Sequence, residues 1–265
     1  MKISLIGCGN MGGAIARALC RAAAPECVSI ANRSAEKAQR LAAELGCAVA
    51  ETNIACAADA DFVFLGVKPA GIFPLLEEIS PALREDAVIV SMAAGVTGTA
   101  MRDALGGKQN PLVRILPNTP CAIGKGLVLI APCGTVAEAS LEKLAALLAP
   151  CGRCARTDEA HADAGMTAGG CTPAYTYLFI DALAAGGERA GLSREEALQW
   201  AAAAVAGAAE LLLQSGKTPG QLCDEVCSPG GSTIEGVNAL RDGGFSDLVA
   251  GAFEKSYVKN GLLGK

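Results

Sequence analysis

The chain has 265 residues, of which 51% are hydrophobic and only 4% aromatic, and its formal net charge is −5. A nucleic-acid-binding surface needs clustered lysine and arginine, so an acidic chain without a basic run is not expected to bind nucleic acid. The nearest candidate for a membrane span, residues 200–209, falls short of the roughly 18 apolar residues required. Residues 2–6 are predicted to form a strand, not a signal peptide. We therefore expect a cytoplasmic globular protein.

Short apolar strands and helical segments alternate in the first part of the chain, with predicted helices such as residues 11–23 and 35–45. This alternation is typical of a parallel, doubly wound sheet covered by helices. We therefore predict a Rossmann-like α/β domain over residues 1–157. Its predicted strands are residues 2–6, 28–31, 62–67, 87–91, 112–116, 127–131 and 153–157.

A glycine-rich turn follows the first strand. Residues 7–12, Gly-Cys-Gly-Asn-Met-Gly, match G-x-G-x-x-G between this strand and the first helix. The glycines permit a tight turn and a close approach of the backbone to a pyrophosphate, and the helix N-terminus favours negative charge. A purely structural turn is the alternative. The place of the motif at the start of a βαβ unit favours a dinucleotide site.

The residues after the second strand indicate which dinucleotide binds. A site for NAD carries an acidic residue about 20 positions beyond the glycines, where it binds the ribose 2′-hydroxyl. This chain has Asn32, Arg33 and Ser34 there, and a guanidinium with polar neighbours suits a 2′-phosphate. The alternative, that Ser34 caps the next helix while Arg33 is solvated, is compatible with anion binding. The sequence favours NADP(H), with NAD(H) as the alternative.

Helix signals replace strand signals after residue 158. Thr172-Pro173 predicts the start of a helix to about residue 190, and a capping box at Ser193 predicts a second helix to about residue 214. The second of these helices has small residues on nearly all sides, so we expect it to pack in a bundle that includes a dimer interface. We predict an all-helical domain over residues 158–265. Further helices are predicted from Thr218-Pro219, Ser228-Pro229 and Phe245.

Twelve cysteines are scattered along the chain, and Cys151 and Cys154 form the one close pair. Since no second pair stands at zinc spacing and His161 is the only histidine, the pattern favours structural thiols in a reducing compartment and no metal. A redox or metal role for Cys151 and Cys154 is the alternative. His161 itself is expected in a solvated loop.

The segment 228–234, Ser-Pro-Gly-Gly-Ser-Thr-Ile, carries the most chemical information in the second part of the chain. It predicts a turn that leads into a helix N-terminus with free N–H groups and up to three hydroxyls. Such a combination can hold a carboxylate without an arginine. An ordinary helix start, with Ser232 and Glu235 as a capping box, is the alternative.

These motifs, taken together and in order, resemble those of the pyrroline-5-carboxylate reductase family. In particular, residues 221–255 resemble the signature sequence of that family. The resemblance implies reduction of L-1-pyrroline-5-carboxylate to L-proline, the last step of proline synthesis. It also implies an N-terminal Rossmann domain, a C-terminal helical dimerisation domain, and commonly a pentamer of dimers. Supporting matches are residues 32–34, 67–69, 91–95, 114–120, 173–175 and 181–184.

The resemblance further implies individual site residues. Thr233 is expected to hydrogen-bond the imine nitrogen, with a role as proton relay open. The other substrate residues are Ser228, Gly231 and Ser232, with Glu159 nearby. The cofactor residues are Ile6, Gly7, Cys8, Gly9, Asn10 and Met11 at the pyrophosphate, Asn32, Arg33 and Ser34 at the 2′-phosphate, and Asn53, Val67, Lys68, Pro69, Met92, Ala93 and Ala94 elsewhere.

Several positions depart from the family pattern. Residues 169–172 are Gly-Gly-Cys-Thr where the family usually has Ser-Gly-Ser-Gly, Met166 and Ala168 replace a threonine and a leucine, and Glu225 replaces an amide. Two alternatives therefore stay open: a reductase of another cyclic imine acid, and a non-catalytic NADP-binding regulator. A 3-hydroxyacid dehydrogenase is disfavoured, because no lysine is available as its base between residues 143 and 217.

Overall fold

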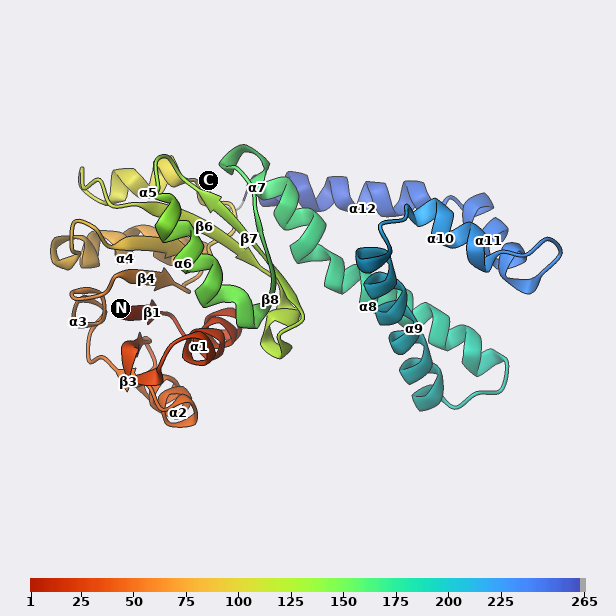
Figure 1. The fold of residues 1–265 in the computed structure, drawn as a ribbon, viewed down its shortest axis with the longest axis horizontal. Helices are drawn as coiled ribbons and strands as arrows, with labels where there is room; N and C mark the ends of the chain where they lie inside the picture. Colours follow the sequence, from red (N-terminus) through yellow and green to blue (C-terminus); the bar gives the residue numbers. More distant parts are fainter. Residues whose placement is uncertain (263–265) are drawn as a thin grey trace. The chain divides into compact units, whose positions relative to one another are not determined.

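The computed structural model describes residues 1–262, which group into two compact units (Figure 1). The first, which we call the sheet unit, comprises Met1–Pro173 and, of the described residues at the C-terminal end, 256–262. The second, Ala174–Lys255, contains only helices and turns and is called the helical unit. The two units confirm the predicted order of an α/β region followed by an all-helical region.

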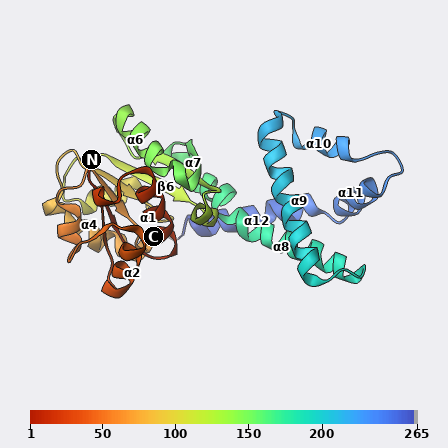
Figure 2. The same ribbon diagram turned by 60° about the horizontal axis from the view of Figure 1, so that its bottom comes forward.

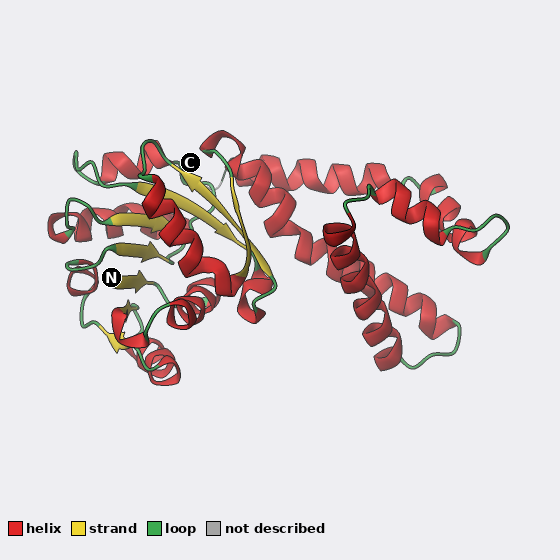
Figure 3. Cartoon of the chain, in the orientation of Figure 1, coloured by secondary structure: helices red, strands yellow, loops and turns green. Residues whose placement is uncertain are grey.

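The sheet unit is built on one eight-stranded sheet with the strand order β3-β2-β1-β4-β5-β6-β7-β8, drawn in yellow in Figure 3. All seven strands predicted from the sequence are present, with ends that differ by at most two residues. The strands are β1 Ile3–Ile6, β2 Val28–Ala31, β3 Ala48–Val49, β4 Phe62–Leu65, β5 Val88–Ser91, β6 Leu112–Pro117, β7 Gly126–Pro132 and β8 Gly152–Arg156.

The sheet is parallel except at one pair, where β7 runs antiparallel to β6. A parallel neighbour needs a crossover of a dozen or more residues, whereas only residues 118–125 link these two strands, so β7 must turn back. The predicted parallel sheet is therefore confirmed except at this one pair. Strand β3, which was not predicted, is a two-residue edge strand too short to produce a hydrophobic pattern.

Helices cover both faces of the sheet, because successive strand residues point to opposite sides. Phe64 belongs to one buried cluster, while its neighbours Val63 and Leu65 belong to the other. One cluster is completed by α1 Asn10–Ala22, α2 Ala35–Leu45 and α6 Glu138–Leu148, and the other by α3 Asn53–Ala57, α4 Ile72–Ile79 and α5 Gly98–Ala104. Short 3-10 turns are η1 Pro25–Cys27, η2 Pro69–Gly71, η3 Ser80–Ala82, η4 Thr119–Ile123 and η5 Ala149–Cys151.

After β8 the chain continues through α7 Glu159–Met166, the π-helical turn η6 Thr167–Cys171 and α8 Thr172–Arg189. His161 was expected in a loop, but it lies in the first turn of α7, where Asp158 caps the helix and accepts hydrogen bonds from both the backbone and the ring of His161. Its side chain is exposed, as a solvated histidine should be.

Two glycines allow α7 and η6 to lie close to the sheet. A Cβ on Gly165 would lie 2.4 Å from Leu129 Cδ1, and one on Gly169 would lie 2.6 Å from Leu127 Cδ2, both on β7. Asn118 Nδ2 donates to the carbonyl of Gly169 at 3.0 Å. The unusual glycine at 169 is therefore explained by a close approach of backbone to side chain, in which a serine would not fit without movement.

The helical unit continues α8 with α9 Arg194–Ser215, α10 Pro219–Val226, α11 Ser232–Asp242 and α12 Phe245–Asn260 (Figure 2). Capping boxes at Ser193 and Thr218 start α9 and α10, as the sequence predicts for Ser193. Helix α11 was expected from Ser228-Pro229 but begins at Ser232. The intervening residues form a turn, in which the Gly231 amide donates to the Ser228 carbonyl at 3.0 Å and Gly230 has φ +70°.

Few residues of the helical unit are buried by the chain itself. Helices α8 and α9 bury one residue each, Ala184 and Ala197, and α10, α11 and α12 bury none. Helix α9 is long and apolar enough to cross a membrane, by length and composition alone. Large apolar side chains such as Leu248 and Leu178 are about 70% exposed. The helical unit therefore has an unfinished hydrophobic core.

Candidate functional site

The carboxyl ends of β1, β4 and β5 lie along one edge of the sheet, because these strands are parallel and in register from Ile6 to Leu65 to Ser91. The strand order reverses between β1 and β4. Ligands of doubly wound sheets bind outside the carboxyl ends of the strands at such a reversal. The sheet thus places the predicted glycine-rich turn, which follows β1, at the expected ligand-binding crevice.

The three glycines of this turn have three different surroundings. Gly7 has φ +104°, and a Cβ there would lie 2.7 Å from the carbonyl carbon of Gly66, the residue after β4. A Cβ on Gly12 would lie only 1.9 Å from Gly7 O, whereas one on Gly9 would meet nothing within 4 Å. Gly7 and Gly12 are therefore required by the packing of the protein itself. Gly9 leaves open space at the N-terminus of α1, as a bound pyrophosphate needs.

Asn32 joins the turn after β1 to the turn after β2. Its Oδ1 accepts a hydrogen bond of 2.9 Å from the Cys8 amide, and its Nδ2 donates to the Ser34 carbonyl at 3.1 Å. Both turns are thereby held together at the point where an adenosine ribose would lie. Asn32 therefore fixes the two turns relative to each other, while the guanidinium of Arg33 and the hydroxyl of Ser34 face solvent.

Arg33 and Ser34 are both available to an anion. Ser34 is the N-cap residue of α2, but its side chain makes no capping hydrogen bond. Arg33 is exposed and forms no ion pair within residues 1–262. Ser34 thus occupies the N-cap position and Arg33 is solvated, as the alternative has it, but the Ser34 hydroxyl does not cap the helix. A guanidinium, a hydroxyl and a helix N-terminus together suit a phosphate.

A small cavity of about 280 Å³ continues this site between α1 and α2. The residues of the glycine-rich turn that line it are Cys8, Gly9 and Asn10. Arg17 is paired with Glu44 at 2.8 Å, and this contact lowers the pKa of the Glu44 carboxyl. The remaining charged lining residues, Lys37 and Arg40, are cationic, so the mouth of the turn carries excess positive charge.

The other predicted cofactor residues follow β4 and β5. Met92 donates its amide to Leu65 O at 3.2 Å, and the Ala93 amide donates to Ser91 Oγ at 3.3 Å, so the two strand ends are tied together. Asn53 lies in α3, where its side chain donates to Glu78 at 2.9 Å. The structure brings Val67, Lys68, Pro69, Met92, Ala93 and Ala94 to the carboxyl edge of the sheet.

An ion-pair network around one buried arginine lies beside this edge and was not predicted as a unit from the sequence. Arg114 on β6 is only 2% exposed, and its Nη2 lies 2.8 Å from Asp163 Oδ1 on α7. Its Nη1 lies 3.9 Å from Oε1 of Glu159, the residue expected near the substrate. The same Glu159 oxygen accepts a hydrogen bond of 2.5 Å from the Gly98 amide.

The second predicted site, residues 228–233, forms a tight turn before α11. Gly231 is the N-cap of α11, and no side chain caps the helix, so the expected alternative of a Ser232–Glu235 capping box was wrong. A Cβ on Gly231 would lie 2.5 Å from Ser228 Oγ, which explains the glycine. The hydroxyls of Ser232 and Thr233 are exposed beside a helix N-terminus, and such an arrangement can bind a carboxylate.

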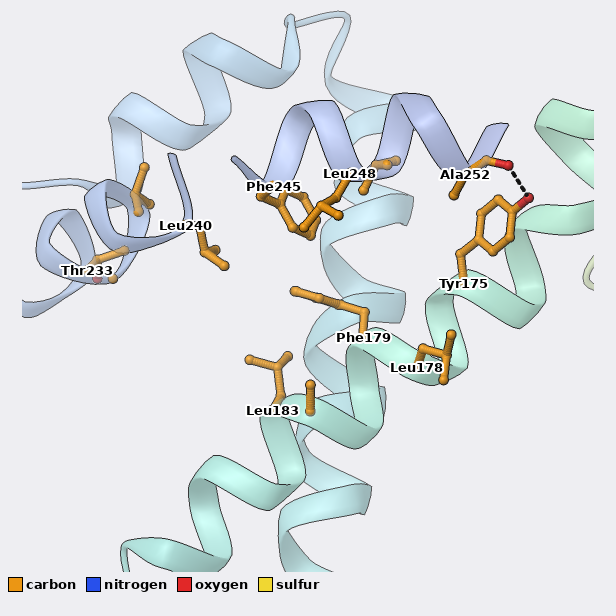
Figure 4. Close-up of a pocket in the computed structure, with 13 residues that line it drawn as sticks. Tyr175, Leu178, Phe179, Leu183, Thr233, Leu240, Phe245, Leu248 and Ala252 are labelled. Carbon is orange, nitrogen blue, oxygen red and sulfur yellow. Dashed lines mark hydrogen bonds between the residues drawn. The ribbon is translucent and has the colours of Figure 1, made fainter. Parts of the chain in front are cut away.

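Thr233 also lines a large cavity of about 810 Å³ within the helical unit (Figure 4). The walls come from α8, α11 and α12 and are almost wholly apolar. Phe179 and Phe245 face each other with ring centroids 6.0 Å apart, and Tyr175 donates to the carbonyl of Ala252 at 3.3 Å. An apolar opening of this size is far larger than a small amino-acid-like substrate requires.

The negative charge of Glu225, which replaces an amide of the family pattern, is compensated locally, because Lys217 Nζ lies 2.6 Å from its carboxylate.

The cysteines are all free thiols. Burial raises the pKa of Cys8 to about 11 and of Cys20 to about 12, while a hydrogen bond with Cys121, and then burial, raises the pKa of Cys151. Thiols that stay protonated are poor nucleophiles, in agreement with the structural role expected for these three. The same hydrogen bond lowers the pKa of Cys121.

The chain resembles known proteins both in sequence and in structure. Residues 159–262 match the family model for pyrroline-5-carboxylate reductase dimerisation, and residues 2–95 match the model for NADP oxidoreductase, coenzyme F420-dependent. The chain is 35% identical to pyrroline-5-carboxylate reductase of Escherichia coli over 100% of this chain and 98% of that protein. The corresponding protein of Aquifex aeolicus is 34% identical over 98% and 96%.

Solved structures agree with the sequence relatives. A pyrroline-5-carboxylate reductase from Coxiella burnetii has a TM-score of 0.92 at 28% identity, and the match covers 100% of this chain and 98% of that one. A pyrroline carboxylate reductase from Plasmodium falciparum with NADP bound has a TM-score of 0.89 at 27% identity over the same shares. Both similarities include the sheet unit and the helical unit.

Proposed function

The chain belongs to the pyrroline-5-carboxylate reductase family, and from this membership we infer that it reduces L-1-pyrroline-5-carboxylate to L-proline, the last step of proline biosynthesis. The observation that carries the inference is similarity over the whole chain, with both the glycine-rich turn and the 228–233 turn in place. The enzyme is accordingly an NAD(P)H-dependent oxidoreductase acting on a C=N bond.

The residues of the sheet unit fit NADP(H). The open space above Gly9 suits the pyrophosphate, and Arg33 and Ser34 are free to bind the 2′-phosphate. When bound, the reduced nicotinamide supplies a hydride. The residues that follow β4 and β5, Val67-Lys68-Pro69 and Met92-Ala93-Ala94, would orient the nicotinamide ring. NAD(H) lacks the 2′-phosphate and would forgo the contacts of Arg33, so we propose NADP(H) as the preferred cofactor.

The 228–233 turn of the helical unit is proposed to hold the substrate. Backbone N–H groups at the start of α11 and the hydroxyls of Ser228 and Ser232 would bind the carboxylate, and Thr233 would hydrogen-bond the imine nitrogen. A protonated cyclic imine is already a strong electrophile, so the protein need not supply a nucleophile. Its task is to hold the imine carbon in line with the hydride and to keep the nitrogen protonated.

The test measures the oxidation of NADPH in the presence of L-1-pyrroline-5-carboxylate, with the loss of NADPH absorbance as the readout. The assay is then repeated with NADH. Thr233→Ala is expected to lower turnover at least about tenfold, because a hydrogen bond to a charged group is lost, while NADPH affinity is unchanged. Thr233→Ser keeps the hydroxyl and is the matched control, with turnover near that of the parent. Near-normal turnover of Thr233→Ala would contradict the role of this residue.

A second candidate, reduction of another cyclic imine acid, is favoured by one observation, the altered segment 169–172. This segment overlaps the π-helical turn η6, and Gly169 packs closely against Leu127. Such π-helical turns occur frequently at functional sites. Comparing turnover on five-membered and six-membered cyclic imine acids separates the two substrates. Tight NADPH binding without turnover on either would indicate a non-catalytic regulator.

The helical unit is proposed to form a homodimer that assembles further, up to a decamer. The family model for dimerisation covers residues 159–262, which supports the proposed domains 1–157 and 158–265. Exposed apolar residues on α9 and α12 would then be covered by a second copy. We propose a cytoplasmic location, where such an assembly meets NADPH. Analytical ultracentrifugation measures the assembly, and a monomer at micromolar concentration would contradict the dimer.

A further inference from the structure

Buried Arg114 and the partly exposed Glu159 form a contact that the proposed binding of substrate and cofactor does not explain. A buried guanidinium needs an anionic partner, and Asp163 already provides one at 2.8 Å. Glu159, one helical turn earlier on α7, lies 3.9 Å from the same guanidinium, too far for a strong hydrogen bond. Charge compensation by itself therefore does not account for Glu159.

The short contact of Glu159 is with the backbone. Its Oε1 accepts from the Gly98 amide at 2.5 Å, across 61 positions of sequence. A Cβ on Gly98 would lie 2.4 Å from Cys133 Cβ and 3.0 Å from Glu159 Oε1, so the absence of a side chain lets the carboxylate reach the amide. Burial, together with the Glu159 charge, raises the pKa of Cys133 to about 12, so this neighbour stays a neutral thiol.

Gly98 is the first residue of α5 and ends the loop 92–97 that leaves β5. The start of this loop is fixed by the bonds of Met92 to Leu65 O and of Ala93 to Ser91 Oγ. Its end is fixed by the bond from Gly98 to Glu159. Met92, Ala93 and Ala94 are the residues of this loop that we place against the cofactor, so Glu159 controls one of the two anchors of that surface.

We propose that Glu159 is a positioning residue for hydride transfer. The carboxylate, 3.9 Å from the Arg114 guanidinium, holds the amide of Gly98, and the loop 92–97 is thereby fixed where the nicotinamide is to lie. This inference rests on the proposed function and assigns Glu159 a task different from the contact with substrate expected from the sequence. Its effect is on the rate, since a misplacement of about 1 Å at a reacting centre can cost about 100-fold.

The experiment compares four variants of the full-length enzyme by kcat and by KM for each substrate. Glu159→Ala removes the anchor and is expected to lower kcat between about tenfold and 100-fold, with KM for the imine acid within about threefold of the parent. Glu159→Gln keeps an oxygen that can accept from Gly98 and should restore most of kcat. Glu159→Asp keeps the charge but withdraws the oxygen from Gly98, so its kcat should lie below that of Glu159→Gln.

Asp163→Asn is the matched control for a merely structural role. It weakens the closer partner of Arg114 on the same helix but does not touch Gly98. We expect a lower melting temperature and a kcat within about threefold of the parent. An equal loss of kcat in Asp163→Asn and Glu159→Ala would overturn the proposal, because activity would then follow the stability of α7 and not the anchoring of Gly98.

Two other results would also overturn it. A KM for the imine acid raised tenfold or more in Glu159→Ala, with kcat retained, would make Glu159 a substrate ligand, and parent-like kinetics would remove any role. If Glu159→Ala does not fold, a kcat of Glu159→Asp above that of Glu159→Gln overturns the proposal and the reverse order supports it. A parent enzyme without turnover on any cyclic imine acid would instead refute the proposed function.

Discussion

The sheet unit and the helical unit differ in where their hydrophobic cores are completed. In the sheet unit the strands are buried on both faces by helices of the same chain, so residues such as Leu5 and Ile89 have no exposed surface. In the helical unit α10, α11 and α12 bury nothing, and a cavity of about 810 Å³ opens between apolar walls. The sheet unit thus completes its core with its own residues. We propose that a second copy completes the core of the helical unit.

The largest expected effect tests this difference directly. Leu248 on α12 is 70% exposed, so Leu248→Glu would be harmless if the helical unit stood alone. Buried at a dimer interface, the new carboxylate would be unpaired, and we expect dissociation and a loss of several kcal/mol in the free energy of unfolding. Analytical ultracentrifugation and thermal unfolding measure the two effects.

Ile123, at the end of η4 in the sheet unit, offers a matched control because it is 75% exposed. Ile123→Glu is expected to leave the assembly intact and to change the free energy of unfolding by less than about 0.5 kcal/mol. Equal behaviour of the two glutamate variants would remove the distinction between the units.

Two glycines of the same turn should separate folding from binding inside the sheet unit. Gly12→Ala places a Cβ 1.9 Å from Gly7 O, and we expect it to lower the free energy of unfolding by about 3 kcal/mol or more. Gly9→Ala meets no protein atom within 4 Å, so its stability should match that of the parent, while the dissociation constant for NADPH rises at least about tenfold. Urea unfolding and cofactor titration give the two readouts, and unchanged NADPH binding by Gly9→Ala would place the pyrophosphate elsewhere.

This contrast also explains what the sequence could predict. The glycine-rich turn and the capping boxes are local patterns, so residues 7–12 and Ser193 could be assigned from the sequence. The direction of β7 follows from the eight residues before it, but only once β6 and β7 are known to be neighbours. The contact of Glu159 with Gly98 joins residues 61 positions apart, and no local pattern encodes it. The small residues of α9 indicate close packing without indicating the partner.

A smaller effect concerns the choice of cofactor. Arg33→Ala removes a free guanidinium beside Ser34, and a charge-assisted hydrogen bond contributes about 1.5–3 kcal/mol. We expect NADPH to bind about tenfold to 100-fold more weakly, while NADH binding is unchanged because NADH has no 2′-phosphate. Titration of each cofactor by quenching of protein fluorescence measures both constants. An equal weakening of NADPH and NADH would show that Arg33 acts on the fold of the turn and not on the phosphate.

The smallest effect concerns the pH dependence of stability that arises from partly or fully buried thiols of the sheet unit. Burial raises the pKa of Cys8 and Cys56 to about 11 and of Cys20 and Cys133 to about 12, against 9.0 for a free thiol. Below pH 9 both the folded and unfolded chains keep these thiols protonated, so their contribution to stability is fully present. Above pH 9 only the unfolded chain ionises, and the free energy of unfolding falls until the pH passes the raised values.

Replacing one of these thiols isolates its share of the alkaline loss. The contribution of each thiol grows with the gap between its folded and unfolded pKa values, and solvent around a partly exposed thiol reduces it. Cys20→Ala should therefore lose stability slightly less steeply than the parent between pH 9 and pH 11. Urea unfolding across this range measures the slopes. Identical slopes would mean that Cys20 ionises in the folded sheet unit as readily as in the unfolded chain, and that burial does not raise its pKa.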